Sequence, residues 1–241
     1  MKLYVQADNT GNMPHHFDAA CALYGALDSG VETRLIRMED LAGINNLVFL
    51  NNPFVGSVEF MREIFSRFGK DPRVPDNSNR DEERITIGEA CRRIESGETL
   101  FVKPVQIKMF TGMVVSKTLL FCLNPYSEDS PVIVCKPFES PIVSEWRCYV
   151  RKTLLGDPIQ DIRCYLGDPF RVPDRGFIED IFRENILRYP KSYAIDVAVL
   201  ESGENVVVEY NDMWALGNYG MENDKYFSML KERYFEIMRG N

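Results

Sequence analysis

Two apolar runs near the end of the chain form the most constraining feature of the sequence, because they are typical of a β-hairpin. They cover residues 193–200 and 206–212, and a Ser-Gly turn signal separates them. Side chains two apart on a strand share a face. Glu209 and Asn211 are therefore expected to point the same way.

A two-residue loop at Ser202 and Gly203 would place Asp196 directly opposite Glu209. Like charges that face each other across a sheet are destabilising. Two carboxylates and an amide on one face suit a hard divalent cation, and Mg²⁺ commonly takes one or two carboxylates plus substrate phosphates. A longer loop would shift the register by one residue, and a solvated sheet edge with harmless acids is the alternative. We predict Asp196, Glu209 and Asn211 as a metal site.

Composition excludes several classes of protein. The chain has 241 residues, 45% of them hydrophobic, which is enough for a sizeable core in one domain or two closely packed ones. The net charge of -8 argues against nucleic-acid binding, and no apolar run is long enough to span a bilayer. Residues 1–20 do not resemble a signal peptide, and the six cysteines form no C-x-x-C pair. We expect a cytoplasmic protein with free thiols.

The first part of the chain alternates between strand and helix patterns. Strands are expected at 2–6, 33–37 and 47–50. Apolar residues at helical spacing predict helices at 17–27 and 60–68. This alternation predicts a small α/β domain with parallel strands at 1–85.

The second part is expected to follow a polar linker at 71–84. Thr86 and Glu89 match a capping box that starts a helix closed by Gly97. Strands are then expected at 99–103, 113–122, 131–136, 143–154 and 158–166, and helices at 177–187 and 226–237 flank the hairpin. We predict an α+β domain with antiparallel sheets at 86–241.

Two of the expected strands end in Lys-Pro. Lys103 can pair with phosphates as a point charge, and the segment from Lys108 to the Thr111-Gly112 pair can offer backbone N–H groups, although it is too poor in glycine for a P-loop. Lys136, Pro137 and Phe138 form a stiff connector that could meet an adenine edge. An exposed lysine and a plain inter-strand loop are the alternatives.

The strand at 143–154 carries charge on one face. Glu145, Arg147 and Arg151 share that face, and Arg163 lies in the next strand. Arginines that face a site can clamp a transferring phosphoryl group. The alternative is a cross-strand salt-bridge ladder of little energetic value.

Taken in order, these pieces resemble the ATP-grasp superfamily, and most closely its small clade related to ribosomal-protein glutamate ligases. The likeness covers about residues 86–220 and depends on the order of Lys-Pro, Ser-Glu-Trp-Arg-Cys-Tyr-Val, Ile-Asp-Val and Val-Glu-Tyr-Asn-Asp. It implies an ATP-grasp fold, α/β plus α+β, in which a small N-terminal α/β domain precedes two α+β subdomains whose antiparallel sheets enclose ATP.

The resemblance also implies roles for single residues. Lys103 would hold the α and β phosphates, and Lys136 would lie beside the adenine, which the backbone of Pro137 and Phe138 would contact. Lys108 stands where the family has phosphate-loop glycines.

For the reacting groups, the resemblance implies that Arg147 and Arg163 face the γ-phosphate and an acyl phosphate. Asp196, Glu209 and Asn211 would bind Mg²⁺. Glu145 stands at a nucleotide-site position where relatives often carry Asp, and the loop with Gly217, Tyr219 and Gly220 would lie near the acceptor.

The function predicted first is an ATP-dependent ligase that joins a small-molecule or peptide carboxylate to an amine through an acyl phosphate. A kinase that uses the same nucleotide site is the second hypothesis. A non-catalytic nucleotide-binding module is the third. Neither nucleic acid nor a membrane is an expected partner.

Overall fold

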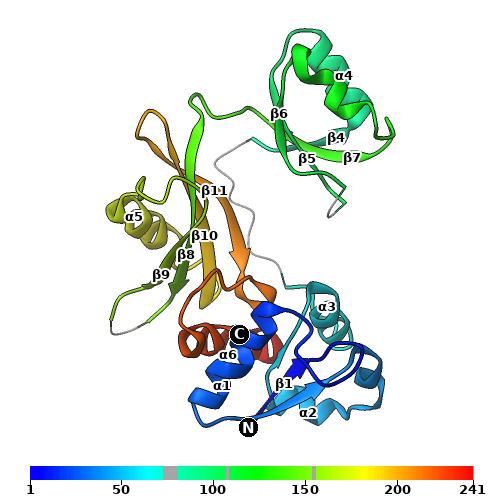
Figure 1. Cartoon of the computed structure of the whole chain (residues 1–241), viewed down its shortest axis with the longest axis vertical. Coiled ribbons are helices and arrows are strands. Elements are labelled where there is room, and N and C mark those ends of the chain that lie inside the picture. The colour runs from blue at the N-terminus through cyan, green and yellow to red at the C-terminus, as the bar shows by residue number, and fades with distance from the viewer. Residues whose placement is uncertain (73–80, 107–108, 154–155, 241) are drawn as a thin grey trace. The chain divides into compact units, whose positions relative to one another are not determined.

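The computed structural model describes residues 1–72, 81–106, 109–153 and 156–240, and the chain forms two compact units. The first unit joins residues 1–77 to residues 142–241, and the second unit is 78–141. Figure 1 gives the elements of each unit. The domain boundary expected between residues 85 and 86 stays a prediction.

The N-terminal part of the first unit is a small parallel sheet, as predicted. The sheet order is β2-β1-β3, with β1 at Lys2–Gln6, β2 at Glu32–Ile36 and β3 at Phe54–Val55. The segments between and after the strands form α1 (Phe17–Asp28), η1 (Met38–Gly43), α2 (Asn46–Asn51) and α3 (Val58–Ser66).

The predicted strand at 47–50 is wrong, because these residues form α2. The side chain of Asn45 accepts the backbone N–H of Leu47 at 2.8 Å and caps this short helix, and Phe49 fills the core. A run of four apolar residues cannot show whether its period is that of a helix or a strand. The third strand comes after the turn, as β3.

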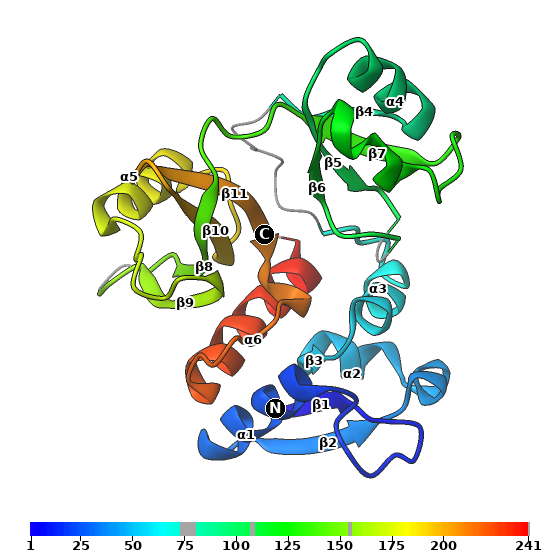
Figure 2. The ribbon, with the colours of Figure 1, turned by 45° about the horizontal axis from the view of Figure 1, so that its top comes forward.

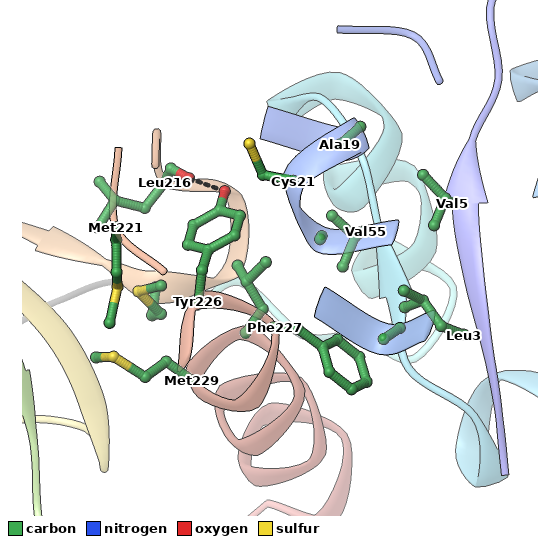
Figure 3. Packing of buried hydrophobic residues seen from close by; sticks show 14 of the residues in the cluster. Leu3, Val5, Ala19, Cys21, Val55, Leu216, Met221, Tyr226, Phe227 and Met229 are labelled. Atoms are coloured by element: carbon green, nitrogen blue, oxygen red, sulfur yellow. Dashed lines mark hydrogen bonds between the residues drawn. The ribbon is translucent and has the colours of Figure 1, made fainter. Parts of the chain in front are cut away.

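The predicted first helix is present, but its large apolar side chains face outward. Phe17, Tyr24 and Leu27 are 71%, 57% and 48% exposed. The buried face carries small residues, and it packs on the long C-terminal helix α6 (Asn223–Arg239). Figure 3 shows residues of this cluster from both helices, among them Ala19 and Cys21 on α1 and Tyr226 and Phe227 on α6. Small side chains allow the two helices to approach closely.

The rest of the first unit is a four-stranded antiparallel sheet with the order β11-β10-β8-β9. Its strands are β8 (Ile142–Arg151), β9 (Ile159–Gly167), β10 (Ser192–Leu200) and β11 (Asn205–Asp212). α5 (Arg175–Asn185) covers one face, where Cys148, Ile195 and Val197 are buried (Figure 1). The opposite face carries polar side chains. The short η3 (Met213–Ala215) leads from β11 towards α6.

The second unit is an antiparallel sheet with the order β4-β7-β5-β6, over which α4 lies (Figure 2). Its elements are β4 (Glu83–Thr86), α4 (Ile87–Glu95), β5 (Leu100–Pro104), β6 (Met113–Val115), η2 (Lys117–Leu123) and β7 (Pro131–Cys135). The capping prediction is confirmed, since the Thr86 hydroxyl accepts the N–H of Glu89 at 3.2 Å.

Two predictions in this unit need correction. The strand expected at 113–122 ends at Val115 and continues as the 3-10 helix η2. Glu83 and Arg84 lie in β4, which pairs with β7, rather than in a linker. Each error comes from reading local polarity without knowing which strand pairs with which.

The close contact of α1 with α6 makes Gly25 a test of this packing. A Cβ at Gly25 would lie 1.9 Å from the backbone oxygen of Asn223. Because backbone cannot move aside easily, Gly25→Ala should lower the free energy of unfolding by about 2 kcal/mol. Urea titration measures this. Gly43→Ala is the control, since its Cβ meets nothing within 4 Å, and equal losses in the two variants would contradict the prediction.

Candidate functional site

A row of four charged residues crosses the polar face of the C-terminal sheet. Asp196 on β10 lies opposite Glu209 on β11 and, on its other side, opposite Arg147 on β8. Arg147 in turn lies opposite Arg163 on β9. Directly opposed residues share a face of the sheet, so the row runs acid, acid, base, base.

The centre of the row is a buried bidentate ion pair. Arg147 Nε donates to Asp196 Oδ1 at 2.9 Å, and Nη2 donates to Oδ2 at 2.7 Å. Arg147 is 7% and Asp196 1% exposed. Burial raises the pKa of Asp196 to about 6, against the opposing pull of Arg147. Burial acts to lower the pKa of Arg147, but the bonded Asp196 carboxylate outweighs it, so the net shift is upward. The two hydrogen bonds fix the plane of the guanidinium group, and Nη1 takes no part in them.

Asn211 joins the two acids of the row. Its Nδ2 donates to Asp196 Oδ2 at 3.0 Å and to Glu209 Oε1 at 3.2 Å. The oxygen and nitrogen of an amide can exchange places by a half-turn of the side chain, so Asn211 can equally present Oδ1 to this point.

The donor set at this point fits a hard divalent cation such as Mg²⁺. It consists of oxygens from two carboxylates and one amide. Asp196 and Glu209 oppose each other, and the single positive charge of Arg147 balances only one of the two carboxylates. Among the described residues, no three His, Cys, Asp or Glu side chains gather as a metal site. A cation at this point would have the amide oxygen of Asn211 available as a third protein ligand, and the assignment of these three residues to a metal stays a prediction.

The pairing of Asp196 with Glu209 was predicted correctly, although the loop was not. Leu200 N–H donates to the Glu204 carbonyl at 2.8 Å, which makes a three-residue loop and brings Val199 opposite Asn205. The register then shifts between Asp196 and Val197, where Val208 is the extra residue of a bulge. The two offsets cancel, and the acids meet.

Two tyrosines stack beside Arg147. The guanidinium carbon lies 4.8 Å from the ring centre of Tyr219 and 5.9 Å from that of Tyr165, and the two rings stack at 5.3 Å. The Tyr165 hydroxyl donates to Glu145 Oε2 at 2.6 Å. Tyr219 has a φ of 49°, and among the described residues it is the only one other than glycine with a positive φ. Such strain often occurs at functional sites.

The loop at 216–221 is fixed by side chains from three elements. The Tyr149 hydroxyl from β8 lies 2.6 Å from the carbonyl oxygen of Gly217. The Tyr226 hydroxyl from α6 donates to the carbonyl of Leu216, as Figure 3 shows. Asp18 from α1 accepts the backbone N–H of Asn218 at 2.7 Å. The loop is thus held next to Arg147.

Arg163 continues the row on β9. Its Nη2 donates to Asp161 Oδ2 at 2.7 Å, whereas its buried Nε has no hydrogen-bond partner among the described residues. With Arg147 as its cross-strand neighbour, it gives one end of the row two guanidinium groups.

Except for Glu145, which lies on β8 of the first unit, the predicted nucleotide residues belong to the second unit. Val102 and Val134 face α4, so Lys103 and its neighbour Ile133 lie on the opposite face of the sheet. Lys103 Nζ lies 3.0 Å from Glu82 Oε1. Lys136 follows β7 and is exposed, with Glu139 at 3.8 Å.

Other predicted nucleotide contacts are described only in part. Pro137 and Phe138, which come next in the chain, are half-buried, and Lys108 is outside the described residues. The roles of all these residues stay predictions.

Sequence reasoning missed two residues of the site. Tyr165 is two residues from Arg163, so strand alternation could have put it on the same face. Asp18 had no local signal, since its partner Asn218 is 200 positions away.

Solved structures share this fold at low sequence identity. They include N5-carboxyaminoimidazole synthase from Aspergillus clavatus with ADP and 5-aminoimadazole ribonucleotide, at 10% identity and TM-score 0.58, covering 96% of this chain and 78% of that one. The ATP-grasp ligase PsnB, with a precursor variant, Mg and ADP, matches at 12% and 0.56, covering 96% and 97%. D-alanine–D-alanine ligase from Bacillus anthracis with ATP matches at 13% and 0.52, covering 99% and 98%.

The fold is that of the ATP-grasp proteins, as predicted. The chain belongs to the ATP-grasp domain family, R2K clade family 2, whose model matches residues 80–229. No curated protein matches the sequence significantly. In the described part of the chain, no helix has the length and apolar character needed to cross a membrane.

The buried ion pair predicts a large loss of stability when one partner is removed. Arg147→Met should lower the free energy of unfolding by about 3 kcal/mol, because it leaves the Asp196 carboxylate buried without its cation. Urea titration measures this, and the double variant with Asp196→Asn should recover part of the loss. Arg151 lies on the same strand as Arg147 and forms a more exposed ion pair with Glu232 of α6. Arg151→Met should lower the free energy of unfolding by under about 1 kcal/mol. Equal costs at the two arginines would contradict the prediction.

Proposed function

We propose that the protein is an ATP-dependent ligase that joins a carboxylate to an amine. The charged row of Glu209, Asp196, Arg147 and Arg163 carries this proposal, because it combines a cation-binding end with an anion-binding end on one sheet face. Membership of the ATP-grasp family supports it.

In the proposed reaction, the substrate carboxylate attacks the γ-phosphorus of ATP, and the bond to the β-phosphate oxygen breaks. ADP leaves and an acyl phosphate forms. The amine then attacks the acyl carbon, phosphate leaves with the bonding electrons, and the amine loses a proton as the amide forms. The protein mainly positions reactants and neutralises charge in such a sequence.

At the acidic end of the row, Asp196, Glu209 and Asn211 would hold Mg²⁺. The ion would neutralise charge that develops on the phosphates. Arg147 keeps Asp196 ionised by pairing with it. The Nδ2 of Asn211 bridges Asp196 and Glu209 in the structure, and the amide would turn to present Oδ1 to the ion.

At the basic end, Arg147 and Arg163 would hold the phosphoryl group in transfer. Both nitrogens of Arg147 that bond Asp196 are on one edge of the guanidinium, so Nη1 is free to donate to an anion near Gly217. The unbonded Nε of Arg163 is a second donor.

In the second unit, Lys103 would pair with the α and β phosphates, and Lys108 would add a contact in the phosphate loop. Lys136 and the backbone of Pro137 and Phe138 would border the adenine. Glu145 would also belong to the nucleotide site, where it accepts a hydrogen bond from Tyr165 and so would hold that ring beside Arg147.

The substrates would be small molecules or peptides. D-alanine–D-alanine ligase and PsnB, which share the fold, are named for or solved with substrates of these two kinds. The order of motifs supports a relation to the ribosomal-protein glutamate ligases.

The proposal predicts that Glu209→Ala abolishes turnover without unfolding the chain. ADP formation with ATP, Mg²⁺ and pools of amino acids or peptides should fall at least about 100-fold, about 2.7 kcal/mol of lost transition-state stabilisation. Circular dichroism should be unchanged, because Glu209 is exposed. Glu204→Ala, an exposed acid in the same hairpin, is the control.

Product analysis separates the ligase from a kinase. A ligase releases phosphate and gains an amide, whereas a kinase leaves a phosphorylated acceptor. An unimpaired rate of ADP formation in Glu209→Ala would refute the proposed metal site.

A further inference from the structure

Asp18 is a partly buried carboxylate without a cation among the described residues. It lies in the first turn of α1 and is 34% exposed. Its one hydrogen bond in the described part of the chain comes from the backbone N–H of Asn218, at 2.7 Å. A carboxylate withdrawn from water without a counter-charge costs free energy.

The nearest cationic candidate, His16, does not supply that charge. Its Nδ1 lies 3.8 Å from Asp18 Oδ2 but accepts the backbone N–H of Ala19 at 3.2 Å, so this nitrogen carries no proton. Burial also lowers the pKa of His16. Asp18 is therefore a negative group that faces the loop at 216–221 unpaired.

Asp18 and Arg147 approach the same point at Gly217. A Cβ on Gly217 would lie 3.8 Å from Arg147 Nη1 and 3.9 Å from each carboxylate oxygen of Asp18, with no closer atom. The half-exposed ring of Tyr219, which stacks on Arg147, belongs to the same loop. An anionic group and the free edge of a cationic group thus flank one position.

We propose that Asp18 binds the ammonium group of the substrate at Gly217, beside the anion held by Arg147. This inference rests on the proposed ligase function and narrows its substrates to compounds with a free amino group, such as amino acids and peptides with a free N-terminus. An ammonium group donates charge-assisted hydrogen bonds to a carboxylate, while the acidic or phosphorylated end of the same substrate pairs with Nη1.

Binding can be read without turnover, by saturation-transfer NMR on the full chain with ADP and Mg²⁺. The probes are a pool of free amino acids and dipeptides, and the same pool with acetylated amino groups. Signals are expected from the free pool and not from the acetylated pool. Alkylamines without an acidic group should bind more weakly than the free amino acids, because they lack the anionic end that pairs with Nη1, and equal binding of alkylamines would contradict that pairing.

The decisive variant is Asp18→Asn, whose amide oxygen can still accept the Asn218 N–H, so the loop keeps its anchor. For each compound of the free pool that binds the wild type, the dissociation constant should rise at least tenfold. Gly217→Ala should also weaken binding, since its methyl group fills the space and fits without a clash. Asp28→Asn, at the other end of α1, makes the same charge change and should leave binding unchanged. Equal melting temperatures verify that the variants fold.

The outcomes separate this inference from the proposed function. Equal binding by wild type and Asp18→Asn, equal binding of the acetylated pool, or no binding of the free pool overturns the ammonium site. Asp18-dependent binding with no ADP formed by any pool would instead count against the ligase and leave the site in place.

Discussion

The ion pair of Arg147 with Asp196 is the interaction on which the polar face of the sheet depends. It joins the two central strands, and its two parallel hydrogen bonds fix the plane of the guanidinium. The apolar face behind it packs on α5, so neither strand can tilt without opening that core. From this pair the other site residues take their positions: Glu209 and Asn211 on one side, Arg163 and the two stacked tyrosines on the other.

The N-terminal residues contribute to the same site through packing. The small side chains of α1 let it lie close against α6, and this contact brings the first turn of α1, with Asp18, to the loop after β11. Hydroxyls of Tyr149 and Tyr226 hold the loop from the other sides. The small parallel sheet packs against α1, and the first turn of α1 contacts the loop at 216–221.

Local pattern predicted much of this, and failed where distant pairing decided the outcome. Alternation predicted β8 to β11, and spacing placed Glu209 and Asn211 on one face. The run at 47–50 was misassigned because four residues are too few to show a period. The run at 113–122 was misassigned because only Met113–Val115 pair with β5, and the chain continues as η2. The loop length was wrong, and only the bulge at Val208 restored the predicted pairing. No sequence rule could have joined Asp18 to Asn218.

The order of charges in the row distinguishes a binding site from a structural ladder. A ladder that served stability alone would alternate its signs, so that each acid opposed a base. Here the order is acid, acid, base, base, and only the central pair is favourable. Asn211 and Asp161 ease the two like-charged contacts without removing them. An amide is neutral, and of the two arginines only Arg163 bonds Asp161. A cation would compensate the acidic end and an anion the basic end, and under the proposed function a magnesium-bound phosphate would supply both to the same face of one sheet.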